Sequence, residues 1–170
     1  VEAVTRLLHR EADRAGVEVE LTIGAGVPDV PAARDQIHQV CLNLTLNAIQ
    51  ASPNGGTISI SVEGDGPTDA PTGARIRFKD SGVGISEENL ERIFDPFFTT
   101  KDPDKGTGLG LMISHQIIAD HGGSIEVDNN MGDGATFQVR LPSARAAAEN
   151  ADSSQSRGPT ARERRGQIPS

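Results

Sequence analysis

The segment from Phe94 to Leu111 reads FDPFFTTKDPDKGTGLGL, and the interpretation of the whole chain depends on it. It begins with three phenylalanines that can anchor one end to a core. Its middle, Lys101 to Lys105, is charged, contains a proline and has no apolar side chain. Because nothing there can offset the entropy cost of ordering, we expect this middle part to be mobile.

Three glycines lie at alternate positions near the end of this segment, Gly106, Gly108 and Gly110, and they lead into the apolar-periodic run MISHQIIADH (112–121). Glycines ahead of a helix expose backbone N–H groups and the positive end of the helix dipole, an arrangement that suits a bound phosphate. A G-x-G-x-G run is also found in ordinary flexible loops. This motif alone therefore leaves a loop and a phosphate site both open.

Apolar and polar residues alternate in five short segments, which is typical of half-buried strands: 17–23, 57–62, 75–79, 124–128 and 136–141. Strands with one apolar face imply a sheet covered on one side only, unlike a doubly wound parallel sheet. Helical periodicity at 1–15, 33–52 and 109–121 can supply that cover. We therefore predict an α+β fold, a two-layer α/β sandwich in which three helices cover one face of a mixed, mostly antiparallel sheet.

The domain organisation follows from length and composition. A chain of 170 residues suits one domain with a core. We expect 1–15 to be the end of an upstream helix that leads into the domain, 16–142 to be the domain, and 143–170 to be a disordered tail or linker. The turn-rich stretch 64–73 is the expected hairpin loop. His9 is interpreted as a solvated helical histidine rather than a phosphoacceptor, because the sequence offers it no partner.

Charge and cysteine content exclude several kinds of partner. The net charge is −8, and the tail from Ser143 carries five Arg against three acidic residues, so the first 142 residues hold about −10. An acidic domain without a basic stripe is a poor candidate for nucleic-acid binding. The single Cys41 excludes an internal disulfide or thiolate metal site and fits a reduced, cytoplasmic setting. No apolar run reaches the 18 or so residues of a membrane span, so we expect no membrane contact by this fragment.

Amide side chains recur every three or four residues along the helix predicted at 33–52 and form one stripe: Gln36, Gln39, Asn43, Asn47 and Gln50. An amide buried without a partner would cost about 1–3 kcal/mol. The stripe either faces solvent or directs its oxygens at a hard cation and phosphates, since Mg²⁺ accepts oxygen ligands and usually keeps substrate phosphates and waters in its shell.

The residues 80–85, DSGVGI, follow directly after the predicted strand RIRFK. An Asp at a strand end is often a turn former. Here Gly82 and Gly84 also allow the backbone to approach a flat ligand, while the Asp80 carboxylate could accept a hydrogen bond from an adenine amino group. The motif by itself leaves the turn and the ligand site open.

Four motifs in this order and spacing resemble the N, G1, F and G2 boxes of sensor histidine kinases: NLTLNA (43–48), DSGVGI (80–85), FDPFFTTK (94–101) and GTGLGL (106–111). These boxes belong to the ATP-binding catalytic domain shared with the gyrase, Hsp90 and MutL ATPases. The resemblance covers about residues 1–142 and extends to HGGSIEVDN and GDGATFQVRLP. Within this family, the sequences NAIQA and PFFTTK are most similar to kinases of the nitrogen-regulation type. The resemblance as a whole implies the Bergerat ATP-binding fold.

The resemblance also implies roles within an ATP site. Asn47 would ligate Mg²⁺, with Asn43 beside it near the phosphates, and Asn43 and Lys101 would be the catalytic residues. Asp80 would accept from the adenine amino group, and Thr136 would reach the same edge of the base. In total, nucleotide binding is implied for Asn43, Asn47, Gln50, Asp80, Gly82, Gly84, Ile85, Phe94, Phe98, Thr99, Thr100, Lys101, Gly106, Thr107, Gly108, Leu109, Gly110, Leu111 and Thr136.

The expected function is phosphoryl transfer from ATP to a histidine. Asn43 stands where the hydrolysing relatives have a Glu, and an amide cannot act as a general base, so positioning and charge neutralisation would carry an in-line transfer. The acceptor would lie on a separate dimerisation domain, and a response regulator receiver domain would act downstream. No His-Glu acceptor box is present, so the chain alone should not phosphorylate itself. Gln50 stands where many family members have Lys or Arg, so one cation fewer would contact the phosphates.

A second hypothesis belongs to a different class. The chain would be an ATP-binding regulatory module that acts by binding a partner when ATP closes the 94–111 segment, without phosphotransfer of its own. A dimerising helical hairpin with a histidine upstream in the full reading frame would favour the kinase. A third hypothesis, a hydrolysing ATPase, is disfavoured by Asn43 and by the FDPFFTTK motif.

Overall fold

The computed structural model describes residues 1–52, 55–101, 106–130 and 132–148. Five strands are present in this part of the chain: β1 (Val17–Ile23), β2 (Gly56–Asp65), β3 (Gly73–Asp80), β4 (Ser124–Asn130) and β5 (Gly134–Pro142). They form one sheet in the order β1-β2-β3-β5-β4. β1 pairs with β2 in parallel, and the other three pairs are antiparallel.

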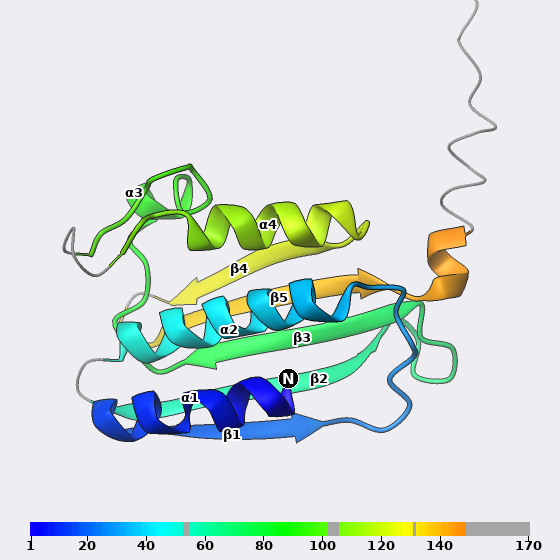
Figure 1. The fold of residues 1–170 in the computed structure, drawn as a ribbon, viewed down its shortest axis with the longest axis horizontal. Helices are drawn as coiled ribbons and strands as arrows, with labels where there is room; N and C mark the ends of the chain where they lie inside the picture. The colour runs from blue at the N-terminus through cyan, green and yellow to red at the C-terminus, as the bar shows by residue number, and fades with distance from the viewer. Residues whose placement is uncertain (53–54, 102–105, 131, 149–170) are drawn as a thin grey trace, which may run out of the picture.

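Three longer helices lie side by side across one face of this sheet: α1 (Glu2–Ala15), α2 (Arg34–Ala51) and α4 (Gly110–Asp120) (Figure 1). A single turn, α3 (Glu87–Leu90), precedes the segment that leads to α4. The predicted α+β sandwich, with a mixed and mostly antiparallel sheet covered on one face, is confirmed. Among the described residues no helix combines the length and apolarity needed to cross a bilayer.

The core lies between α2 and the sheet, because each contributes one apolar face. Ile58, Ile60, Phe78 and Val139 point to the helical side of the sheet and are almost completely buried. The opposite face of the sheet carries charged residues in ion pairs, such as Arg140 with Asp65 at 2.8 Å. The period-two alternation in the sequence thus separates a buried face from a solvated one.

Two observations bear on the expected domain boundaries, which stay predictions. α1 is part of the sandwich, as the predicted three-helix cover requires, since Val4, Leu8 and Ala12 are buried in the same core as α2. Ordered structure also continues beyond Ser143, because residues 144–148 are helical. Of the expected tail 143–170, residues 149–170 lie outside the described residues, and so do residues 102–105 of the part 101–105 that we expected to be mobile.

Smaller features of the sequence interpretation can also be compared with the fold. The hairpin between β2 and β3 is present, but its loop is shorter than the predicted 64–73, since pairing reaches Asp65 and Gly73. His9 is exposed on α1 and lies 3.5 Å from Asp13, which fits the interpretation as a solvated histidine.

The topology brings four chain segments to one end of the sandwich. β3 ends there with Asp80, β5 begins there, α2 ends there and α4 begins there (Figure 1). The turn at α3 and the segment that follows it lie at the same end. Each motif singled out in the sequence falls on one of these segments.

Candidate functional site

A cavity of about 750 Å³ lies at this end of the molecule. Its walls come from α2, from the loop after β3, from the segment between α3 and α4, from the start of α4 and from the start of β5. The predicted site residues that line it are Asn43, Asn47, Gln50, Asp80, Gly84, Ile85, Phe98, Thr99, Thr100, Lys101, Gly106, Thr107, Gly108, Gly110 and Leu111. Gly82, Phe94, Leu109 and Thr136 do not line it.

The amide stripe on α2 is divided between two environments. Gln36 and Gln39 are exposed and lie outside the cavity, as the solvent-facing interpretation predicts. Asn43, Asn47 and Gln50 line the cavity, as the ligand-site interpretation predicts. The stripe is divided because only the C-terminal half of α2 reaches the end of the sandwich where the loops converge, and for the three amides in the cavity the ligand-site interpretation stays a prediction.

The amide of Asn43 is held in one orientation by α4. Its Nδ2 donates to the Oγ of Ser114 at 2.9 Å, and Ser114 is only 1% exposed. Gly110 lies directly against the Asn43 carboxamide, so a Cβ at position 110 would collide with Oδ1. Since Nδ2 is engaged by Ser114, the oxygen is the part of this amide left to face the cavity.

Lys101 extends from the segment after α3 to α2. Its Nζ donates to Asn47 Oδ1 at 2.9 Å and also to Gln50 Oε1. Both acceptors are neutral, and within the described residues Lys101 forms no ion pair. Burial lowers the pKa of the Lys101 ammonium below its ordinary value. The cavity thus contains a cation whose charge no described acidic residue compensates.

Asp80 lies at the inner wall of the cavity, 3% exposed, at the end of β3. Its Oδ1 accepts from the backbone N–H of Gly82 at 2.9 Å and of Ala135 at 3.2 Å. Both recorded hydrogen bonds end on the same oxygen, so Oδ2 is the atom available to a ligand. Gly82 does not line the cavity but fixes this carboxylate, and a Cβ there would collide with the carbonyl oxygen of Ala51 at the end of α2.

Thr136 is not placed where we expected it. Side chains alternate between the faces of a strand, and Ala135 and Phe137 on β5 line the cavity on the helical side. Thr136 therefore points to the opposite face, where it is paired in register with Lys79 and Asp128. Ala135, next to the expected residue, is the one that contacts Asp80.

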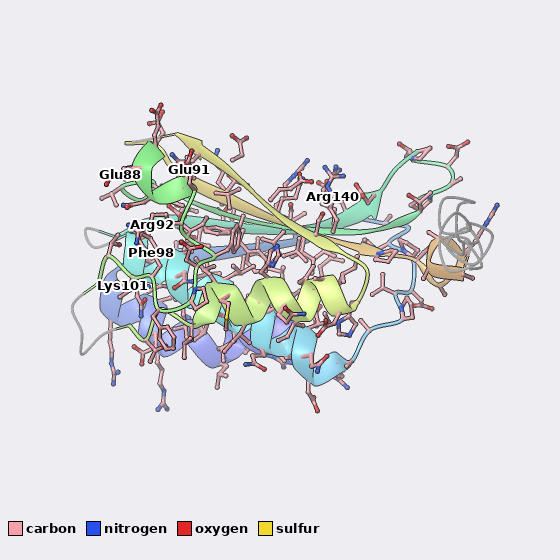
Figure 2. All side chains as sticks on the ribbon, turned by 90° about the horizontal axis from the view of Figure 1, so that it is seen from above. Glu88, Glu91, Arg92, Phe98, Lys101 and Arg140 are labelled. Atoms are coloured by element: carbon pink, nitrogen blue, oxygen red, sulfur yellow. The ribbon has the colours of Figure 1, made fainter. Side chains whose placement is uncertain are left out.

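The aromatic anchors of the 94–101 segment differ from one another. The Phe94 ring lies 5.1 Å from the His115 ring of α4, outside the cavity. Phe98 lines the cavity and stacks beneath the Arg92 guanidinium at 4.6 Å (Figure 2). Phe97 is 73% exposed with φ at 64°, so the expectation that it pins the segment to the core is wrong. Only two of the three phenylalanines act as anchors.

The structure adds site residues that the sequence interpretation did not identify. Asn129 on β4 accepts from the N–H of Ile85 at 2.7 Å and donates to its carbonyl at 2.6 Å, which fixes the loop after β3. Ser114 and Ala135 are two more. A signal for Asn129 exists, because alternation places it on the same face as Ile125 and Val127, where a polar residue is unexpected. Ser114 gives no such signal.

The arrangement has distinct chemistry at its two sides. One side offers the Asp80 carboxylate as an acceptor, and the other offers the Lys101 cation and the glycine-rich start of α4. A ligand that fits both would have a hydrogen-bond donor on a flat group and several negative charges at its far end. The volume lies in the range of small-molecule and cofactor sites, about 300–1,000 Å³. A nucleotide has these properties.

Comparison with known proteins agrees with this geometry. The family described as histidine kinase-, DNA gyrase B- and HSP90-like ATPase matches residues 32–145, more than half of the chain. The chain belongs to this ATPase family. The match begins just before α2 and ends within the helical turn after β5, so it includes every wall of the cavity.

Relatives of this ATPase domain are sensor kinases. The sensor histidine kinase ZraS of Escherichia coli is 40% identical over 137 residues, which are 81% of this chain and 28% of that protein. Sporulation kinase E of Bacillus subtilis is 36% identical over 143 residues, 84% of this chain and 19% of that protein. The chain thus spans less than a third of these relatives.

Solved structures give the same result. The catalytic domain of the histidine kinase ThkA superposes with a TM-score of 0.70 at 37% identity and covers 83% of this chain and 90% of that one. Full-length ShkA in complex with AMPPNP superposes with a TM-score of 0.72 at 27% identity, over 83% of this chain and 28% of that one. The chain is therefore an ATPase domain of the histidine kinase type.

Proposed function

We propose that this domain binds ATP with Mg²⁺ and transfers the γ-phosphoryl group to a histidine on a separate dimerisation domain. The observation that carries the proposal is the presence, within one cavity, of the buried Asp80 acceptor and of the Lys101 cation, which pairs with no acidic residue in the described part of the chain. The family relationship and the AMPPNP complex of the similar kinase ShkA support it.

The adenine side of the site centres on Asp80. Its free Oδ2 would accept from the adenine amino group, and Oδ1 is already held by two backbone N–H groups. This arrangement keeps the carboxylate rigid, so little ordering entropy is lost when the base binds. The bidentate contact of Asn129 with Ile85 would hold the loop beside the base in the same way.

The phosphate side would use Asn47, Lys101 and the glycines at the start of α4. Asn47 Oδ1 already accepts an ammonium group, so this amide oxygen is oriented for a cation, and Mg²⁺ binds such oxygens together with phosphates and waters. When bound, Mg²⁺ would neutralise phosphate charge and help to align the γ-phosphoryl group. Gly108 has a φ of +66°, a backbone conformation that residues with a side chain rarely adopt.

The transfer step needs little covalent chemistry from the protein. An imidazole nitrogen of the acceptor histidine would attack the γ-phosphorus, the bond from phosphorus to the β,γ-bridging oxygen would break, and ADP would leave with the electron pair. Asn43 cannot deprotonate water, and Ser114 holds its amide in place. ATP should therefore persist in the site until the histidine arrives.

The acceptor and the later partners are part of the proposal. A histidine-bearing dimerisation domain in the same kinase would supply the nucleophile, and a response regulator receiver domain would take the phosphoryl group from it. A cytoplasmic setting fits this chemistry, since ATP is the donor.

Transfer in trans tests the proposal. The chain is mixed with γ-labelled ATP, Mg²⁺ and the histidine-bearing domain of the same kinase, and alkali-stable, acid-labile label on that domain is measured. We expect label to accumulate with the wild-type chain, to be lost with Asn47→Ala, and ATP turnover without the acceptor to stay near background. Nucleotide binding without any transfer would instead favour a regulatory binding module.

A further inference from the structure

Among the residues that the structure describes, Lys101 is held by neutral oxygens of a helix and not by an acidic residue. Its ammonium donates to Asn47 Oδ1 at 2.9 Å and to Gln50 Oε1, which lie one turn apart on α2. Figure 2 shows Lys101 in the segment between α3 and α4, at the end of the molecule where α2 ends. The ammonium of Lys101 therefore comes from the segment between α3 and α4, whereas the oxygens that hold it belong to α2.

The C-terminal end of α2 favours a cation there. Unpaired carbonyl groups at a helix C-terminus carry partial negative charge, so a cation in the last turn is stabilising. α2 has no basic residue in its own last turn, which includes Gln50. Lys101 supplies the missing positive charge from outside the helix.

The rest of Lys101 is also held in place. Its backbone N–H donates to Thr99 Oγ1 at 3.1 Å. Gly106 lies against its aliphatic stem, because a Cβ at position 106 would be 3.3 Å from Lys101 Cδ. The backbone, the aliphatic stem and the ammonium of Lys101 are thus all fixed by contacts, which come from Asn47, Gln50, Thr99 and Gly106.

We infer that Gln50 is a positioning residue for Lys101 and does not itself bind ATP. Within the proposed function, on which this inference rests, Asn47 has two tasks, because its oxygen receives Lys101 and would also receive Mg²⁺. An amide oxygen bound to Mg²⁺ is a poor acceptor for a second cation. Gln50 holds the Lys101 ammonium beside the phosphates when Asn47 binds Mg²⁺. The segment after α3 thus contributes the cation that faces the phosphates, and Gln50 fixes its position.

The first test uses the chain without nucleotide. The chain contains three lysines, Lys79, Lys101 and Lys105, and exposed Lys79 serves as the internal reference. Competitive acylation followed by mass spectrometry is carried out from pH 7 to 10, which separates the accessibility of each amine from its basicity. We expect Lys101 to be less accessible than Lys79.

Variants on α2 show whether Gln50 is responsible. Gln50→Ala should raise the accessibility of Lys101 about tenfold, the size expected for loss of a hydrogen bond to a charged group. Gln50→Glu, which keeps an acceptor oxygen, should restore protection. Gln39→Ala is the matched control, an exposed amide on the same helix outside the cavity, and should change nothing. Equal accessibility of Lys101 in wild type and Gln50→Ala would overturn the inference.

The second test measures AMPPNP affinity by calorimetry in a cycle of variants. Gln50→Ala should weaken binding several-fold in the wild-type background but add no further loss to Lys101→Met, because it acts only through Lys101. Gln50→Lys combined with Lys101→Met should recover most of the affinity lost by Lys101→Met, since it returns the cation from the other side.

Each outcome has a defined meaning. Equal losses from Gln50→Ala in both backgrounds, or no recovery by Gln50→Lys, would overturn the inference and make Gln50 a direct ligand. Failure of the wild-type chain to bind AMPPNP would contradict the proposed function, and the acylation test would then still decide whether Gln50 seats Lys101.

Discussion

At the scale of single residues, the site depends on atoms whose orientation is fixed from outside the cavity. Asp80 is held by Gly82 and Ala135, and Asn43 is held by Ser114. In both residues one polar atom is engaged by the protein and another remains for a ligand. This division allows buried polar groups to be satisfied and still leaves them able to bind.

Asp80→Asn tests the adenine role. The amide keeps one acceptor oxygen for the backbone N–H groups but presents a donor to the adenine amino group. We expect ADP affinity to fall at least about tenfold, as for loss of a charge-assisted hydrogen bond, and GDP affinity to change much less. Calorimetry with both nucleotides measures this, and similar losses for ADP and GDP would contradict it.

Ser114→Ala tests the orientation of Asn43. Removal of the hydroxyl leaves the half-buried Asn43 amide without its partner, which should cost about 1–2 kcal/mol of unfolding free energy and weaken nucleotide binding. Thr45→Val is the matched control, because among the described residues the Thr45 hydroxyl donates only to the carbonyl of Cys41, within α2. The control should lower stability in urea unfolding but leave affinity unchanged. Unchanged affinity in Ser114→Ala would remove the orienting role.

The predictability of these residues from sequence varies with the distance of their contacts. Asp80 could be singled out because a carboxylate and two glycines follow one another after a strand. Ser114 could not, because its partner lies 71 residues away and on another helix. Thr136 was misassigned by one position, since a shift of one residue moves a side chain to the other face of a strand.

At the scale of elements, the C-terminal half of α2 and the start of α4 both line the cavity and approach each other closely at Gly110. α4 begins at Gly110, and the Asn43 carboxamide occupies the space that a side chain at position 110 would need. The glycine therefore allows the start of α4 and the amide of α2 to border the same space.

Gly110→Ala tests this close approach. The added methyl group must displace Asn43, so we expect nucleotide affinity to fall about tenfold or more and unfolding free energy to drop by about 1–3 kcal/mol, as for overpacking. Gly26→Ala is the control, since Gly26 has open space around it and only its backbone, at φ +73°, disfavours a side chain. It should cost only stability. Normal affinity of Gly110→Ala would show that the walls can separate without loss of the site.

The elements themselves were largely predictable. Five alternating segments and three helical ones were identified because amphipathic periodicity is a local property of the sequence. The short α3 was missed, since four residues give no helical period. The packing of α1 on the sheet was predicted, because its one apolar face needs a partner and the sheet offers one.

At the scale of the whole molecule, the stability of the core can be tested through Cys41, a buried residue of α2. Burial raises the pKa of its thiol from 9.0 to about 11. A raised pKa means that the folded state favours the neutral thiol. The associated stability is complete below pH 9 and is lost as the pH rises from 9 to 11.

We therefore expect the unfolding free energy to decrease by roughly 2 to 3 kcal/mol at most across this window, since each pKa unit corresponds to about 1.4 kcal/mol. Urea unfolding at pH 7, 9, 10 and 11 measures the loss. Cys41→Ala has no thiol to titrate, so its stability should fall less steeply over the same range. Parallel curves for the two proteins would show that the Cys41 thiol does not contribute.

The central claim is that the cavity is an adenine-nucleotide site that depends on Mg²⁺, and calorimetric titration of the chain with AMPPNP, with and without Mg²⁺, tests it most directly. Intrinsic fluorescence is a poor alternative, since the chain has no Trp or Tyr. We predict saturable binding that tightens with Mg²⁺ in the wild-type chain and loses this Mg²⁺ dependence in Asn47→Ala. Absence of binding at millimolar AMPPNP, or an Mg²⁺ effect unchanged by Asn47→Ala, would contradict the account.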